Sequence, residues 1–242
     1  MSNLLIDIGN TFSKIAVFEN NEMIYESKVE IIEINFIKDL INKYKIKNTA
    51  ISNVGSPNDE LFSVCKEKSN LYSFTEEIKI PITNPYNHGL VGDDRLALVL
   101  SAYSDYPDDN VLIVDMGTCI TYDIKTNKNL YQAGGISPGL ELRLKSLSSG
   151  TFKLDKITPK YPNLLIAHDT ESSISIGVLK GIQNEIEGFI ENYKTEYNNL
   201  KVIISGGDSD FLYGKIKNTI FTNSNFIYKG LNFLIEHNQV NE

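Results

Sequence analysis

The sequence predicts an α/β protein of two domains with mixed sheets, and three observations lead to that prediction. An acidic glycine turn occurs twice, at Asp7-Ile8-Gly9-Asn10-Thr11 and at Asp115-Met116-Gly117-Thr118, each directly after a run of apolar residues. Strand-like and helix-like patterns alternate along the chain, which is typical of α/β domains. A polar segment with a proline, at 106–110, separates two sets of elements. The repeated strand–turn–strand unit therefore indicates a duplication, with a cleft between the halves across which two carboxylates face each other.

The first predicted domain, residues 1–109, begins with three short strands joined by tight turns. Apolar residues at helical spacing then predict helices, and a stretch with two prolines and a glycine predicts a loop. In order, the predicted elements are strands within 3–28, a helix at 34–44, a strand at 49–54, a helix at 59–68, a loop at 78–90 and a helix from Asp94 through Tyr103.

The second predicted domain, residues 110–242, repeats the pattern of strands followed by helices. The predicted elements are strands near 111–115, 119–125 and 129–135, helices near 139–147 and 171–196, a strand at 201–205 and a helix at 231–237. The long helix carries an apolar residue every four positions, and such a stripe is predicted to face the core. Its members are Ile174, Val178, Ile182, Ile186 and Ile190.

Composition excludes several classes of protein. The formal charge of −8 and the pI near 5.0 argue against a nucleic-acid-binding surface, which needs a basic face. Cys65 and Cys119 lie far apart and match no disulfide or zinc pattern. The chain shows no signal-peptide pattern and no apolar run long enough to cross a bilayer, so a cytoplasmic protein is expected.

The two turns favour phosphate binding. Gly9 permits a backbone bend that other residues resist, and exposed N–H groups in such a bend can bind phosphate oxygens. A single Asp-x-Gly is commonly just a β-turn, so the repetition at Asp115 is what favours the functional interpretation. Neither a P-loop nor a GxGxxG fingerprint follows any strand.

The segment Gly92-Asp93-Asp94-Arg95 precedes an apolar helix and allows two interpretations. Either Asp could cap the helix N-terminus. Alternatively, one Asp acts as general base for a substrate hydroxyl and Arg95 binds an anionic group. Both can hold if Asp93 caps the helix and leaves Asp94 available.

Two glycine-rich segments, at 134–139 and at 205–208, are each predicted as a turn between a strand and a helix. Either could be turn chemistry alone or a close approach of the backbone to a ligand.

In their order, the motifs DIGNT, GDDR, DMGT, GGISPG, HDTESS and SGG resemble those of type III pantothenate kinases, members of the acetate and sugar kinase/Hsp70/actin superfamily. The resemblance extends from Asp7 to about Leu231. It implies a duplicated ribonuclease-H-like (actin-like ATPase) fold and ATP-dependent phosphorylation of pantothenate, the first step of coenzyme A synthesis. It also implies a homodimer, a monovalent cation such as K⁺ or NH₄⁺, and a divalent cation with ATP, expected to be Mg²⁺.

The resemblance also implies roles for individual residues. Asp115 would bind the monovalent cation, and Asp94 would accept the proton of the pantothenate hydroxyl. The expected ATP contacts are Asp7, Ile8, Gly9, Asn10, Thr11, Phe12, Ser13, Lys14 and Thr118. The expected substrate contacts are Tyr86, Gly92, Asp93, Asp94, Arg95 and Thr170. The chain departs from the family pattern in two places: the loop after Tyr86 lacks a proline and is one residue shorter, and Cys119 stands where alanine is common.

Two other functions remain open from the sequence. One is a kinase of the same superfamily for a different small hydroxyl substrate; the short chain and the GDDR segment argue against it. The other is a nucleotide-binding regulatory or accessory protein without catalysis. Retention of Asp7, Asp94 and Asp115 argues against that function, since a non-catalytic descendant has no reason to keep all three.

Overall fold

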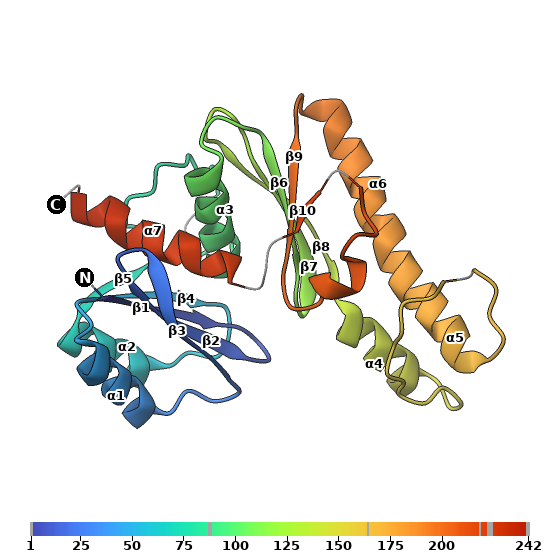
Figure 1. The fold of residues 1–242 in the computed structure, drawn as a ribbon, viewed down its shortest axis with the longest axis horizontal. Helices are drawn as coiled ribbons and strands as arrows, with labels where there is room; N and C mark the ends of the chain where they lie inside the picture. The colour runs from blue at the N-terminus through green and yellow to red at the C-terminus, as the bar shows by residue number, and fades with distance from the viewer. Residues whose placement is uncertain (1, 87–88, 164, 218, 222–224, 241–242) are drawn as a thin grey trace. The chain divides into compact units, whose positions relative to one another are not determined.

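The computed structural model describes residues 2–86, 89–163, 165–217, 219–221 and 225–240 (Figure 1). The chain divides into two compact units. The first comprises Met1–Asp108, Lys128–Gln132 and Asn225–Glu242, and the second comprises Asp109–Asn127 and Ala133–Ser224. The domain boundary predicted after residue 109 lies one residue from the point, after Asp108, at which the chain first passes from one unit to the other. The C-terminal segment, however, packs with the first unit.

Strands and helices alternate along most of the chain. The strands are β1 (Ser2–Ile8), β2 (Ser13–Glu19), β3 (Glu22–Val29), β4 (Asn48–Asn53), β5 (Asn70–Ser73), β6 (Val111–Met116), β7 (Cys119–Lys125), β8 (Tyr131–Pro138), β9 (Lys201–Ser205) and β10 (Ile220–Phe221). The α-helices are α1 (Ile34–Tyr44), α2 (Asp59–Lys68), α3 (Asp93–Asp105), α4 (Leu140–Gly150), α5 (Thr170–Ser175), α6 (Gly181–Glu196) and α7 (Phe226–Val240). A π-helical turn, Ile176–Lys180, joins α5 to α6, and a short 3₁₀ helix spans Ser209–Leu212.

The described part of the chain forms two five-stranded sheets with the same topology. Their orders are β3-β2-β1-β4-β5 and β8-β7-β6-β9-β10. In each sheet the central strand pairs antiparallel with the strand that follows it and parallel with the strand on its other side. The duplication and the mixed sheets predicted from the sequence are therefore confirmed.

In the first unit, helices cover both faces of the sheet. Alternate residues of β1, including Leu4 and Ile6, pack with α1 and α2 in one apolar cluster. Helices α3 and α7 lie side by side on the opposite face, where α7 also contacts β1 and β4 (Figure 1). Contact between the two helices is close, because a side chain at Gly230 would collide with the carbonyl oxygen of Ala97. The Ser101 hydroxyl reinforces it by accepting the Gly230 N–H at 2.8 Å.

A row of amide hydrogen bonds also anchors α7 to the first sheet. Asn48 Nδ2 donates to Asn3 Oδ1 at 2.9 Å, and Asn3 Nδ2 donates to Asn232 Oδ1 at 2.8 Å. Asn232 Nδ2 in turn donates to Asn21 Oδ1 at 2.9 Å. Buried amides are costly unless paired, so this row favours one position of α7 on the sheet.

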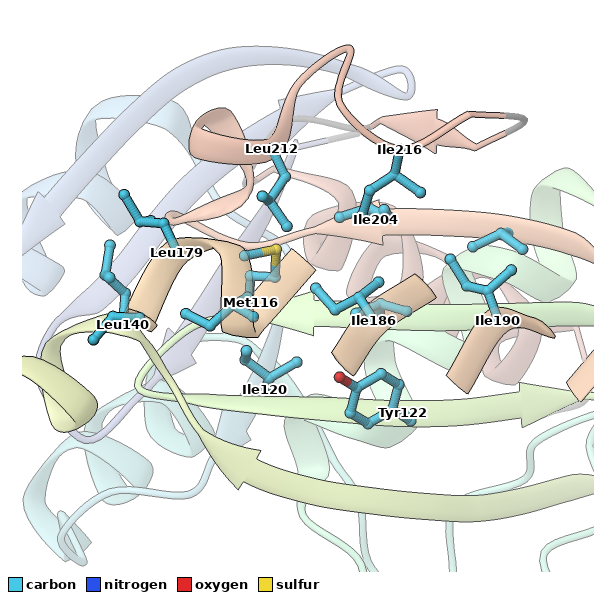
Figure 2. Close-up of a cluster of buried hydrophobic side chains, with 14 of the residues drawn as sticks. Met116, Ile120, Tyr122, Leu140, Leu179, Ile186, Ile190, Ile204, Leu212 and Ile216 are labelled. Atoms are coloured by element: carbon cyan, nitrogen blue, oxygen red, sulfur yellow. The ribbon is translucent and has the colours of Figure 1, made fainter. Parts of the chain in front are cut away.

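The core of the second unit lies between its sheet and α6. Figure 2 shows Ile186 and Ile190 of this helix near Tyr122 of β7, with Met116 and Ile204 in the same cluster. The predicted stripe of the long helix is confirmed, since its five members are all buried. The helix predicted over 171–196 contains the π-helical turn, which includes Gly177 and is followed by Gly181. Glycine's low helix propensity eases such a departure from α geometry.

Most predicted elements match the observed ones, and the exceptions have physical causes. Strands β5 and β10 were not predicted, because they are short and form only beside a neighbouring strand. Helix α7 begins five residues before the predicted start at 231, because Gly230 resembles a helix breaker but serves the contact with α3. No helix in the described ranges is long and apolar enough to span a membrane.

Candidate functional site

Asp7 lies near the end of β1, in a row of polar residues across the first sheet. Its register partners are Lys14 on β2 and Ser52 on β4, and the Ser52 hydroxyl donates to Asp7 Oδ1 at 3.1 Å. Residues paired in register project from the same face of a sheet. Lys14 and Ser52 therefore flank the Asp7 carboxylate.

The electrostatic environment of Asp7 is that of a buried acid near other charges. Burial raises the pKa of Asp7 to about 6, and the carboxylates of Asp94 and Asp93 add to the rise. The Lys14 ammonium and the Ser52 hydrogen bond oppose it by stabilising the charged form. The structure thus brings Asp7, Lys14, Asp93 and Asp94 into one electrostatic group.

The predicted phosphate loop is a tight turn between β1 and β2. The Gly9 N–H donates to the carbonyl of Phe12 at 3.2 Å, and a side chain at Gly9 would crowd that carbonyl. Asn10 and Thr11 are exposed, whereas Ile8 packs in the core. Of the predicted contacts here, Ile8 can therefore offer a ligand little besides its backbone.

The GDDR segment forms the N-terminus of α3, next to the end of β4. Gly92 is the residue that precedes the helix, and the Asp93 carboxylate accepts the backbone N–H of Asn53 at 3.1 Å. The N-cap residue is therefore Gly92 and not either Asp, and the Asp93 side chain ties the helix to the sheet. Asp94 Oδ1 accepts the N–H of Arg95 at 2.7 Å, and the Arg95 side chain is buried.

Asp115 occupies in the second sheet the position that Asp7 has in the first. It lies near the end of β6, in register with Thr121 on β7 and Ser205 on β9. A carboxylate beside two hydroxyl-bearing residues offers the oxygen donors that alkali and alkaline-earth cations prefer. The turn that follows is one residue shorter than the first, because Asp115 and Thr121 are six positions apart whereas Asp7 and Lys14 are seven apart.

The second turn is enclosed by two glycines from other segments. A side chain at Gly206, which has a φ of +97°, would collide with the backbone of Met116. A side chain at Gly139 would collide with the carbonyl oxygens of Gly117 and Thr118, and the Gly139 N–H donates to the Thr118 carbonyl at 3.0 Å. The glycine-rich segments at 134–139 and 205–208 thus each contribute a glycine that packs against the backbone of the second turn.

Part of the first glycine-rich segment is not a loop. Gly134 and Gly135 lie inside β8, and a side chain at Gly134 would collide with the Tyr122 carbonyl and the Tyr193 hydroxyl. The prediction of a turn at these two residues is therefore wrong, whereas the strand predicted near 129–135 includes them. Gly134 serves close packing against the neighbouring strand and α6.

The remaining predicted substrate residues lie outside these two turns. Tyr86 is partly exposed, and its backbone N–H donates to Asn84 Oδ1 at 3.0 Å. Its ring packs edge-on against that of Tyr131, with 5.8 Å between the ring centroids. The next two residues of its loop, 87–88, lie outside the described residues. Thr170 is the exposed first residue of α5, after a capping box made by Asp169 and Ser172.

Among the described residues, no three His, Cys, Asp or Glu side chains cluster as a metal-binding group. Mg²⁺ usually keeps several waters and binds through one or two carboxylates together with substrate phosphates. Asp7 and Asp115 each fit that limited role.

Comparison with known proteins identifies the family. The model of the type III pantothenate kinase family matches residues 3–192. A type III pantothenate kinase from Christiangramia forsetii is 43% identical, over 98% of this chain and 99% of its own. One from Flavobacterium psychrophilum is 38% identical, over 97% of this chain and 98% of its own. The chain belongs to the type III pantothenate kinase family.

A solved structure supports the fold of this family member. A protein from Campylobacter jejuni, described as a proposed Baf family transcriptional activator, superposes with a TM-score of 0.63 at 24% identity. The superposition covers 98% of this chain and 99% of that one. At that identity the likeness concerns the fold alone.

Ser52 and Ser205 were not among the site residues predicted from the resemblance. They occupy equivalent positions, each in register with the aspartate of the central strand. The sequence contains a signal for both, since Ile51-Ser52 and Ile204-Ser205 each end an apolar strand shortly before a glycine. The repeat of Asp7 and Asp115 is therefore accompanied by a second repeat, of one serine on β4 and one on β9.

Proposed function

We propose that this protein transfers the γ-phosphate of ATP to pantothenate, which yields 4′-phosphopantothenate in the first step of coenzyme A synthesis. The observation that carries the proposal is the near full-length similarity to type III pantothenate kinases. The electrostatic group of Asp7, Lys14, Asp93 and Asp94 provides chemistry suited to phosphoryl transfer. A loose transition state needs positioned cations and a group that orients the attacking hydroxyl, and little else.

The proposal gives Asp94 the role of proton acceptor for the primary hydroxyl of pantothenate. Its position at the start of α3, near Asp7, supports that role. Because the proton departs late in a loose transition state, the carboxylate mainly has to orient the hydroxyl. Gly92, Asp93 and Arg95 would line the same substrate site, together with Tyr86 and Thr170. A guanidinium such as that of Arg95 suits the pantothenate carboxylate.

The turn from Asp7 to Lys14 would hold the ATP phosphates, with the N–H groups of the exposed residues 10–12 and the Lys14 ammonium as donors. Thr118 would also contact ATP. Asp115 would bind K⁺ or NH₄⁺, whose charge offsets that of the phosphates when bound. A divalent cation, Mg²⁺, would accompany ATP mainly through phosphate and water ligands.

The proposal further includes a homodimer and a cytoplasmic location. Both follow from the family resemblance. Light scattering on the purified protein tests the first, since a chain of 27.2 kDa would give twice that mass.

A direct assay tests the activity. ADP release should require pantothenate together with ATP, and replacing K⁺ with Na⁺ should lower the rate. A panel of sugars and short hydroxy acids serves as the comparison. Turnover with one of these and not with pantothenate would overturn the proposal, as would ATP binding without turnover on any acceptor.

A further inference from the structure

Three side chains of the second unit meet at one carboxylate, that of Glu185 on α6. The Tyr122 hydroxyl of β7 donates to Glu185 Oε1 at 2.9 Å, and the Ser137 hydroxyl of β8 donates to the same oxygen at 2.5 Å. The Arg143 guanidinium of α4 donates to Oε2 at 2.5 Å. A single side chain thus connects α6 to two strands and a second helix.

The Arg143–Glu185 pair is partly shielded from water. Each of its side chains is 22% exposed, so the pair is screened less than a surface ion pair. Burial raises the pKa of Glu185, but the hydrogen bonds from Ser137, Arg143 and Tyr122 outweigh burial and hold that pKa below its ordinary value. Glu185 is therefore ionised at neutral pH and accepts charge-assisted hydrogen bonds, which are the stronger kind.

The same group of residues fixes the junction of β8 and α4. Arg143 Nε donates to the carbonyl of Pro138, the last residue of β8, at 2.7 Å. The next residue, Gly139, donates its N–H to the Thr118 carbonyl at 3.0 Å. A continuous path of hydrogen bonds and chain connections therefore runs from Glu185, through Arg143 and the junction, to the turn that follows Asp115.

Gly139 leaves this turn little freedom, because a side chain there would collide with the carbonyl oxygens of both Gly117 and Thr118. A shift of the junction would therefore displace the turn or break its hydrogen bond to Gly139. Since close-packed backbone transmits displacement, the position of the turn depends on what holds the junction.

We propose that Glu185 is a positioning residue for the turn from Asp115 to Thr118. It holds Ser137 and Arg143, these hold the β8–α4 junction, and the junction holds the turn. Insofar as that turn contacts ATP and a monovalent cation, the inference rests on the proposed function. Loss of the Glu185 charge should then weaken the binding of ATP and K⁺ more than the binding of pantothenate.

Amide hydrogen exchange tests the inference independently of activity. In Glu185→Gln, the Gly117 and Gly139 amides, which donate to the Cys119 and Thr118 carbonyls, should exchange about tenfold faster or more. The amides of β9 should exchange at the wild-type rate. That result would exclude a general destabilisation of the second unit. The matched control is Glu191→Gln, which removes an exposed carboxylate on the same helix that pairs with Lys194.

Kinetics provide the second readout. The KM for ATP and the K⁺ concentration that gives half-maximal activity should each rise about fivefold to tenfold in Glu185→Gln, as expected for losing a hydrogen-bonded charge. The KM for pantothenate should stay within about twofold of wild type. If the wild type shows no pantothenate-dependent turnover, the proposed function fails, and the exchange rates still decide the role of Glu185.

Two milder variants keep the test decisive if Glu185→Gln does not fold. Ser137→Ala removes one donor to Glu185, and Arg143→Lys keeps the positive charge but removes the Nε–H that binds Pro138. Each should show the same pattern with smaller changes. Wild-type exchange at Gly117 and Gly139 in all folded variants would overturn the proposal, as would equal losses in the ATP and pantothenate KM values.

Discussion

Asp7 is a buried acid whose raised pKa makes folding depend on pH. Its pKa rises from 3.8 to about 6 on folding, because burial disfavours the charged form. Between these values the unfolded chain has released the proton while the folded chain still holds it. Stability contributed by this group therefore falls as the pH rises from about 4 to about 6. It then stays lower by up to about 3 kcal/mol at neutral pH.

Replacing Asp7 with Asn should remove this pH dependence. We expect the unfolding free energy of Asp7→Asn, relative to wild type, to increase by up to about 3 kcal/mol between pH 3.5 and pH 7.5. Urea denaturation at several pH values measures it. Asp39→Asn, which changes an exposed carboxylate on α1, is the control. A difference that does not vary with pH would contradict the assigned burial effect.

Asp94 should matter for chemistry and little for nucleotide binding. In Asp94→Asn we expect kcat to fall by at least about 100-fold, the usual cost of losing a general base, with ATP affinity within about twofold of wild type. Calorimetry measures the affinity and ADP release measures the rate. Asp39→Asn, which changes an exposed carboxylate on α1, is the comparison and should leave both quantities at their wild-type values. Wild-type turnover in Asp94→Asn would refute the assigned base.

Some features of the site could be predicted from the sequence at this scale and others could not. The repeat of Asp7 and Asp115 was visible, because each follows an apolar strand and precedes a glycine. The contact that ties Asp93 to β4 could not be predicted, because its partner is a backbone group 40 residues away in the chain. Local patterns predict local contacts and carry no information about a partner this remote in the chain.

At the scale of elements, the bounds of α1 and α2 match their prediction, because spacing and end signals are local. Asn58, for example, caps α2 by accepting the Leu61 N–H at 3.1 Å. Glycines were harder to interpret. Gly134 and Gly230 look like breaks in regular structure, yet each lies inside an element and allows close packing.

Two glycine substitutions should separate close packing from helix propensity. Gly230→Ala would place a methyl group against the Ala97 carbonyl and should lower stability by roughly 1–3 kcal/mol, as overpacking does. Gly188→Ala is the matched control in α6, because a methyl group there meets nothing within 4 Å. It should raise stability by about 0.5–1 kcal/mol. Thermal melts of both variants measure this, and equal shifts would contradict the packing argument.

At the scale of the whole molecule, the duplication and the path of the chain differ in how far they can be predicted. The repeated strand–turn–strand unit indicated two related sheets, and both have the same strand order. The return of α7 to the first unit could not be predicted from patterns, since its partners α3, β1 and β4 are remote in sequence. The position of α7 is determined by surfaces that are complementary only in the folded protein, including the row of amides through Asn3 and Asn232.

The first unit should therefore need the end of the chain in order to fold. Helix α7 buries large side chains at Phe226, Tyr228, Leu231, Leu234 and Ile235. At about 1.5–3 kcal/mol for each, their burial contributes on the order of 10 kcal/mol, as much as the whole stability of a typical domain.

A chain that ends at residue 224 should consequently lose protection from hydrogen exchange in β1 and β4 while it retains protection in β6 and β9. Exchange followed by mass spectrometry measures both, with the full chain as reference. Adding a peptide of residues 225–242 should restore protection in β1 and β4, which distinguishes loss of α7 from a general effect of truncation. Full protection of β1 in the truncated chain would mean that the first unit is stable without α7, and the energetic argument from its buried side chains would then be wrong.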